Sequence, residues 1–429
     1  MLLELPLQMG RESCHSRPII NFIDKRILRT DESLRLSVYA EERTNMIILQ
    51  PKYIDEFKCD GSKCNAKCCG TNWRIAIDMD TYKKYQRIKN PAMRKKILSC
   101  LEPDAGGQGF QIKLQSDRTC PLVCEDNLCY IQRHMGEAAL SITCMCYPRN
   151  VKHIGGYQFR TLSMTCPLAA EQALFSADGM IMQQSVSKDD ALAWHLAAVH
   201  GEKKQISDDL LAVHIIMGGL AILQNNHYSM EQRLVLLGLF MDKLDAGERD
   251  AESVSELIEY YNGEKFHQEI SNLWNNWRFY PTAHRQMLEG ILNVLGKEKK
   301  LDLIAPFLFM DYNYDKLYAE KHEAVKRDLG GLMEKYWQQE WLYHVFPYAI
   351  KGSLMHNYFA FLIAYEVAQL YVYGVYDVDK ASGREWIMEM LGFFSKIFDH
   401  RNLFLDTLVK ETAVFESEPL KFMQVLLRI

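Results

Sequence analysis

The sequence predicts a mainly α protein in which a small, irregular α+β unit rich in cysteine precedes a large α-helical domain. Three observations support this fold class. Eleven of the twelve cysteines lie between Cys59 and Cys166. Short stretches in which apolar and polar residues alternate, as in half-buried strands, lie in the same region. Beyond residue 175 the apolar residues recur with helical spacing, and Gly or Pro separates most of the periodic stretches.

Composition and pattern divide the 429 residues into three segments. Residues 1–45 carry charges of both signs without a sustained period, and Met46 begins a run that resembles a natural protein start. We therefore expect residues 1–45 to be a disordered or non-native extension. Residues 46–175 are expected to form a cysteine-rich domain that binds a cluster, with metal cross-links compensating for its modest core. Residues 176–429 are expected to form the α-helical domain.

The cysteine-rich segment contains short predicted elements. Alternation of apolar and polar residues predicts strands over residues 74–78, 110–114 and 157–162. Residues 80–97 have the composition of a helix, with one apolar face and many basic residues on the other. The glycine-rich stretch 104–109 neither follows an apolar strand nor opens a helix, so it is expected to be a turn and not a nucleotide-binding loop.

The C-terminal segment is predicted to be almost entirely helical. Ser207, a good N-cap, precedes a helix expected over residues 208–224. The most apolar stretch, residues 358–376, is interrupted by Glu366 and Gln369, whereas a membrane-spanning helix needs about 20 residues with almost no polar groups. We therefore expect a buried helix there. The other predicted helices cover residues 230–244, 253–261, 284–295, 316–343, 359–373 and 383–398.

The overall composition excludes several classes of protein. A hydrophobic content of 48%, a charged content of 24% and a net charge of −5 are ordinary for a globular protein. This charge gives no overall basic field, so no nucleic-acid partner is predicted. No basic region followed by an apolar run opens the chain, so we expect a cytoplasmic location. The sequence is compatible with peripheral membrane contact and with an oligomer.

The cysteines indicate a metal centre, because disulfides are disfavoured in the cytoplasm. The spacing of the densest group does not match a zinc finger. Its adjacent cysteines Cys68 and Cys69 are expected to point in different directions, so that they serve different metal atoms or one of them is structural. Thiolates suit iron–sulfur clusters and zinc alike, and both stay open. The groups are Cys59, Cys64, Cys68 and Cys69, then Cys120, Cys124 and Cys129, then Cys144 and Cys146, and finally Cys166.

The residues around these cysteines resemble the flagellin lysine-N-methylase family. A weaker match is Glu334-Lys335-Tyr336, where the family pattern has Glu-Asn-Tyr, together with Phe346-Pro347. The resemblance extends from Met46 to the C-terminus, and the cysteine block is its specific part, since the helical part alone would identify nothing. The matching residues are Gln50 to Cys59, Cys64, Cys68, Cys69, Asn72, Trp73, Ile77, Asp78, Tyr82, Cys120, Pro121, Cys129, Cys144, Tyr147 to Arg149, and Ser163 to Pro167.

The resemblance implies transfer of a methyl group from S-adenosylmethionine to lysine ε-amines of flagellin. It also implies an iron–sulfur cluster of the 4Fe–4S type, with zinc as the alternative. Cys124 and Cys146 fall outside the family pattern, and the departure at Lys335 leaves open whether its helix lines the site. The implied cofactor-binding residues are Cys59, Cys64, Cys68, Cys69, Cys120, Cys129, Cys144 and Cys166, of which the first four are the implied metal ligands.

The chemistry of methyl transfer points to three candidate catalytic residues. A lysine amine is protonated below about pH 10.4 and must lose its proton before direct transfer. Sulfonium cations and methylated amines bind well against aromatic faces. Trp73 and Tyr147, beside the thiols, and the nearby Arg149 are therefore the candidate catalytic residues. Two other functions stay open: a protein-binding module that zinc only stabilises, and an electron-transfer protein without methylase activity.

Overall fold

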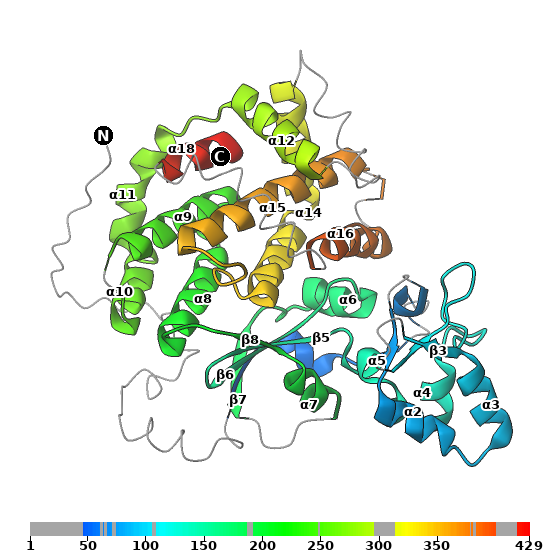
Figure 1. Cartoon of the computed structure of the whole chain (residues 1–429). Coiled ribbons are helices and arrows are strands. Elements are labelled where there is room, and N and C mark those ends of the chain that lie inside the picture. The colour runs from blue at the N-terminus through cyan, green and yellow to red at the C-terminus, as the bar shows by residue number, and fades with distance from the viewer. Residues whose placement is uncertain are drawn as a thin grey trace, which may run out of the picture.

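In the computed structural model of the chain, two hydrophobic cores of unequal size form adjacent units (Figure 1). The smaller core belongs to the cysteine-rich unit at the right of the figure, and the larger core joins a β-sheet to most of the helices. The predicted mainly α fold class is confirmed. The structure describes residues 46–60, 63, 67–70, 74–104, 109–186, 192–247, 249–295, 314–377, 379–380, 383–399 and 418–429. The predicted extension over residues 1–45 lies outside these ranges.

The smaller unit has an α+β core. Ile77 from a strand and Tyr85 and Ile97 from helices are buried in it. Its strands pair antiparallel in the order β2-β4-β3. The strands predicted over residues 74–78 and 110–114 are therefore confirmed, in shorter form. The elements are η3 (Lys67–Gly70), β2 (Ala76–Ile77), α2 (Met79–Gln86), α3 (Pro91–Ser99), β3 (Leu101–Pro103), β4 (Phe110–Ile112), α4 (Tyr130–Met135), η4 (Glu137–Ala139) and α5 (Ile142–Cys146).

The helix predicted over residues 80–97 is in fact two helices, α2 and α3. Asn90 caps the second one, since its Oδ1 accepts a hydrogen bond from the backbone N–H of Met93 at 3.1 Å. Pro91 takes the first position of α3. Proline lacks an N–H and has a fixed φ, so it begins a helix readily but cannot continue one. Composition alone predicts one long helix, but Asn90 and Pro91 begin a second helix after α2.

The larger unit contains a five-stranded sheet with the order β7-β1-β6-β5-β8. β6 lies parallel to β1 and antiparallel to β5. The strand predicted over residues 157–162 is confirmed as β6. Strands from both sides of residue 175 share this sheet, so the predicted domain boundary crosses a continuous core. The strands are β1 (Ile47–Pro51), β5 (Arg149–Ile154), β6 (Tyr157–Leu162), β7 (Met182–Val186) and β8 (Glu202–Lys204), and the short helix η2 (Lys52–Glu56) follows β1.

The helices predicted in the C-terminal segment are confirmed, with ends that shift by a few residues. The cap of α8 differs from the prediction, because Asp208 and not Ser207 accepts a hydrogen bond from the N–H of Leu211, at 3.0 Å. Four helices of the larger unit, α6, α7, α11 and α18, were not predicted. The helices are α6 (Pro167–Phe175), α7 (Leu192–Val199), α8 (Asp209–Leu223), α9 (Met230–Ala246), α10 (Ala251–Tyr261), α11 (Glu264–Asn275), α12 (Pro281–Leu295), α14 (Tyr314–His344), α15 (Leu354–Val375), α16 (Arg384–Asp399) and α18 (Pro419–Leu426).

The apolar helix α15 runs through the middle of the larger core. It is long and apolar enough to cross a membrane by length and composition, yet 89% of its most apolar stretch is buried inside the structure. It packs against α9, α14, α16 and α18. The prediction of a buried core helix over this stretch is therefore confirmed.

A carboxyl group on α15 is buried within this core. Glu366 accepts a hydrogen bond from the hydroxyl of Tyr318 at 3.1 Å, and its Oε2 lies 3.4 Å from Nε2 of His284. Nδ1 of His284 lies 2.9 Å from the hydroxyl of Tyr314. Burial raises the pKa of Glu366 to about 8 and lowers the pKa of His284 to about 3. At neutral pH the pair is therefore uncharged, with a proton on the carboxyl group.

This arrangement predicts a loss of stability as the pH rises past neutrality. Between about pH 6.5 and 8 the folded state keeps the Glu366 proton, whereas the unfolded chain has already lost it. The free energy of unfolding should therefore fall across this interval, by about 2 kcal/mol. At pH 4.5 to 6.5 the proton that the unfolded chain binds at His284 offsets this effect. Glu366→Gln should remove the fall between pH 6.5 and 8, as measured by urea denaturation at several pH values.

The matched control is Glu385→Gln, which changes an exposed glutamate on α16 and should keep the wild-type pH profile. A wild-type free energy of unfolding that stays constant from pH 6.5 to 8 would contradict the protonated Glu366. An unchanged slope in Glu366→Gln would do the same.

Candidate functional site

Five cysteines converge beside the smaller core and are called the thiol group below: Cys68, Cys69, Cys120, Cys129 and Cys144. The Sγ atoms of Cys68 and Cys69 lie 3.8 Å apart, and the N–H of Cys120 donates to the carbonyl of Cys69 at 2.8 Å. Burial raises the pKa of Cys120 to about 11 and that of Cys144 to about 12, and the neighbouring thiols add to both shifts. The hydrogen bond between Cys68 and Cys69 lowers the pKa of Cys68 and raises that of Cys69.

The prediction that Cys68 and Cys69 point apart is wrong. The turn of η3 brings their sulfurs to 3.8 Å. Two thiolates bound to one tetrahedral zinc, at about 2.3 Å each, lie about 3.8 Å apart. The spacing of this pair therefore suits one shared metal atom. In a 4Fe–4S cluster, by contrast, each thiolate binds its own iron.

The donor set suits a soft metal, although it forms no complete site in the described ranges. Cys69, Cys120, Cys129 and Cys144 are free thiols. Among the residues that the structure describes, no three His, Cys, Asp or Glu side chains are placed to hold one metal ion. Cys64, which lies between Cys59 and Cys68 in the dense motif, falls outside those residues. The thiol group thus supplies the ligand type that zinc and iron–sulfur clusters require, and one pair has a metal-binding spacing.

The other cysteines lie elsewhere. Cys59 is exposed, and Cys166 is buried in the larger core at the start of α6. Cys124 and Cys146 are half-buried, and Cys146 has Arg149 as its charged neighbour. The assignment of Cys59 and Cys166 as cofactor ligands therefore stays a prediction, and so does the placing of Cys124 and Cys146 outside the family pattern. Cys124 lies close enough to Cys129 to contribute to the raised pKa of that thiol.

Arg149 connects the cysteine-rich unit to the larger one. Its Nη1 donates to the carbonyl of Met145 on α5 at 3.0 Å, and its Nη2 lies 3.5 Å from Oε1 of Glu137. The guanidinium also lies 5.6 Å from the ring of Trp194 on α7. These contacts describe an arginine that fastens α5 in place. Its role as a catalytic residue stays a prediction.

The structure describes one of the two aromatic candidates, Tyr147. The hydroxyl of Tyr147 lies 3.1 Å from Oγ1 of Thr165, and its ring packs against the larger core. Trp73 lies outside the described residues. The geometry therefore gives Tyr147 a packing role and leaves its catalytic role a prediction.

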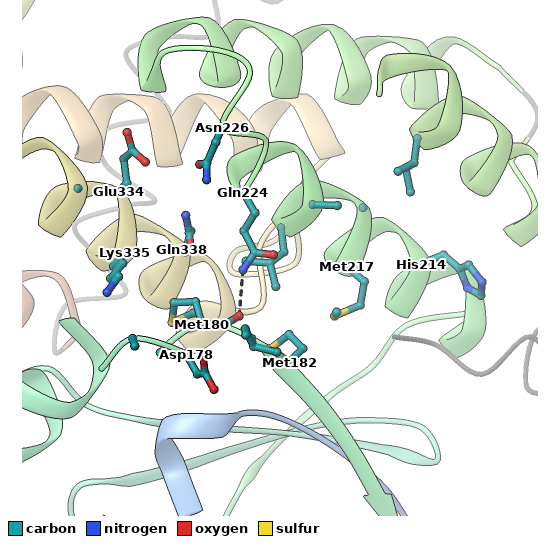
Figure 2. Close-up of a pocket in the computed structure, with 18 of the residues that line it drawn as sticks. Asp178, Met180, Met182, His214, Met217, Gln224, Asn226, Glu334, Lys335 and Gln338 are labelled. Atoms are coloured by element: carbon teal, nitrogen blue, oxygen red, sulfur yellow. Dashed lines mark hydrogen bonds between the residues drawn. The ribbon is translucent and has the colours of Figure 1, made fainter. Parts of the chain in front are cut away.

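A pocket of about 460 Å³ opens in the larger unit and is called the helix pocket below. Its walls come from α8, α10, α14 and the segment over residues 177–182 (Figure 2). Three thioether side chains form much of its apolar surface. The polar side chains include an adjacent pair of opposite charges on α14. The residues used below are Met180, Met182, Met217, Gln224, Glu334, Lys335 and Gln338.

Both charged side chains of α14 are held by defined partners. Nζ of Lys335 donates to the carbonyls of Leu174 and Ser176 at 3.0 and 2.9 Å, which satisfies backbone acceptors at the end of α6. Oε2 of Glu334 accepts from Nη1 of the buried Arg233 at 2.8 Å. The helix that the sequence left undecided therefore does line a pocket. The weak family match at residues 334–336 is the one feature of the sequence that pointed to this helix as part of a site.

Comparison with known proteins identifies the family. The FliB lysine N-methylase C-terminal domain family matches residues 219–426. The chain is 32% identical over 144 residues to the flagellar biosynthetic protein FliU of Salmonella muenchen, a stretch that covers 33% of this chain and 84% of FliU. The chain belongs to the FliB lysine N-methylase family.

Two further relatives are named lysine-N-methylase. The one from Salmonella choleraesuis strain SC-B67 is 33% identical over 141 residues, and the one from Salmonella typhimurium strain LT2 is 32% identical over 141 residues. The matched stretch covers 32% of this chain and 35% of each of these two relatives. No solved structure matches the chain.

The family match lies in the helical part of the chain. Residues 219–426 run from within α8 to the last residue of α18. The expectation that the helical part alone identifies nothing is therefore wrong. Its helices hold family-specific information. The α10 and α14 walls of the helix pocket lie within the matched residues.

The contacts of Lys335 predict a structural cost for its removal. Lys335→Met keeps the aliphatic length but leaves the carbonyls of Leu174 and Ser176 without the ammonium donor. We expect the free energy of unfolding to fall by about 1–3 kcal/mol in urea denaturation. The control Lys316→Met removes an exposed lysine near the start of α14 and should change stability by less than about 0.5 kcal/mol. Equal stabilities of the two variants would show that the two carbonyl contacts contribute nothing.

Proposed function

We propose that the protein is a cytoplasmic methyltransferase that transfers a methyl group from S-adenosylmethionine to lysine ε-amines of flagellin. The observation that carries this proposal is membership in the FliB lysine N-methylase family. Relatives that bear the name lysine-N-methylase or the name of a flagellar biosynthetic protein support the reaction and its flagellar context.

The reaction makes two demands on the protein. The neutral amine of the substrate lysine attacks the methyl carbon of the sulfonium, the carbon–sulfur bond breaks, and S-adenosylhomocysteine leaves with the electron pair. The amine must first lose a proton, because the lysine pKa is about 10.4 in water. An apolar environment favours the neutral amine. A donor site enclosed by apolar walls therefore favours the transfer.

We assign a metal centre to the thiol group, with an iron–sulfur cluster as the family resemblance implies and zinc as the alternative. Cys68, Cys69, Cys120, Cys129 and Cys144 would hold it. When bound, an iron–sulfur cluster supplies one-electron chemistry, whereas zinc supplies only structural support. The 3.8 Å spacing of the sulfurs of Cys68 and Cys69 favours the zinc alternative.

The activity is tested with anaerobically purified protein, flagellin and S-adenosylmethionine. We expect flagellin lysines to gain the mass of methyl groups, located by peptide mass spectrometry, and S-adenosylhomocysteine to form in equal amount. Folded, metal-loaded protein that leaves flagellin unmodified would overturn the proposed function.

The thiol group makes a separate prediction about metal content. Cys129→Ser and Cys144→Ser should each lose most of the bound metal, because a hydroxyl is a poor ligand for a soft metal. Cys146→Ser is the matched control and should keep the wild-type metal content, since Cys146 lies outside the thiol group. Elemental analysis and the visible absorption spectrum measure the outcome. Equal metal content in all three variants would contradict the assignment, and zinc without iron in an active enzyme would exclude the cluster.

A further inference from the structure

We propose that the helix pocket binds S-adenosylmethionine, an assignment that rests on the proposed function and gives the methyl donor a place in the fold. The pocket has a volume of about 460 Å³, within the range of about 300–1,000 Å³ that is usual for small-molecule sites. Its walls belong to four separate segments of the larger unit, and none of them contains a member of the thiol group (Figure 2).

Two charged side chains of α14 line the pocket and could each meet one charge of an amino-acid head group. Glu334 and Lys335 are consecutive residues of α14, and both line the pocket. Glu334 uses Oε2 for Arg233, which leaves Oε1 to accept from the donor's ammonium. Lys335 uses two N–H bonds for backbone carbonyls, which leaves a third to meet a carboxylate. Their side chains extend from α14 in opposite directions (Figure 2), so the amino-acid head group would meet one of these two charges and not both.

The remaining walls match the other parts of the ligand. Met180, Met182 and Met217 offer flexible, polarizable thioethers that make favourable contacts with aromatic rings such as adenine. Nε2 of Gln224 donates to the carbonyl of Met180 at 2.9 Å, and Nε2 of Gln338 donates to the carbonyl of Leu223 at 3.3 Å. These bonds fix both amides and leave their Oε1 atoms as acceptors for the adenine amine and the ribose hydroxyls.

The substrate lysine is a poorer match for the same pocket. Its side chain carries one cation and no anion, so it would offer no acceptor to the third N–H of Lys335. It also lacks an aromatic ring to cover the three methionines and donors to reach both glutamine oxygens. The donor, which carries all these groups, accounts for more of the lining.

A pair of neighbouring glycines on α14 provides a matched test. Gly331 lines the pocket, and a Cβ added there meets nothing within 4 Å, so we expect the ring of Gly331→Phe to occupy part of the pocket. Gly330 does not line the pocket, and a Cβ added there meets only Cγ of Lys326, at 3.9 Å. Both substitutions remove a glycine from a helix interior, which favours folding. Thermal unfolding of both variants checks that the fold is kept.

The readout is binding of S-adenosylmethionine and S-adenosylhomocysteine, measured by calorimetry on the metal-loaded protein. We expect Gly331→Phe to weaken both affinities by about tenfold or more, which corresponds to about 1.4 kcal/mol. Gly330→Phe should bind within about twofold of the wild-type protein. Unchanged affinity in a folded Gly331→Phe would overturn the pocket assignment and leave the proposed methylase activity standing. A wild-type protein that binds neither compound would overturn the proposed function, and the assignment with it.

A second measurement does not depend on the folding of any variant. Irradiation of the wild-type protein with radiolabelled S-adenosylmethionine, followed by peptide mapping, should label a peptide from residues 177–182 or 331–338. Label in residues 74–144 would place the donor in the cysteine-rich unit instead and overturn the assignment to the helix pocket.

Discussion

The larger unit depends on the packing of one long helix, α14, which packs against α6, α8, α12, α15 and β6. Gln339, buried near the C-terminal end of α14, donates to the carbonyl of Leu162 on β6 at 2.8 Å and accepts from the hydroxyl of Tyr53 at 2.7 Å. Trp341 donates from Nε1 to the carbonyl of Ile216 on α8 at 2.9 Å. Buried polar groups of this kind are costly unless paired, so these bonds fix the register between the helix, the sheet and α8.

A close contact between two helices makes this arrangement possible. A Cβ at Gly219 on α8 would lie 2.2 Å from Cζ2 of Trp341, so only glycine allows α8 to approach α14 at this level. Toward the N-terminal end of α14 the same pair of helices encloses the helix pocket, with Met217 on one wall and Lys335 on another. The contact between α8 and α14 therefore differs along its length. The indole of Trp341 fills the space between the two helices at Gly219, whereas the pocket opens between them beside Lys335.

The proposals assign metal and methyl donor to different units. The thiol group lies in the smaller core, while the pocket lies among helices of the larger core. The two units meet where Arg149 joins α5 to Trp194 on α7, and α5 also packs on β2. The uncharged pair of Glu366 and His284 has no assigned part in the chemistry, and it makes the stability of the larger core depend on pH.

The sequence by itself determined the local features. It predicted the strand over residues 157–162, the buried helix around Glu366 and the family, because alternation, helical spacing and cysteine spacing are local signals. It could not show that Cys68 and Cys69 converge, since the backbone turn decides side-chain direction. Nor could it find the sheet shared by β1 and β7, because strand pairing joins residues far apart in the chain. The helix pocket was equally hidden, since it exists only where separate helices fail to fill the space between them.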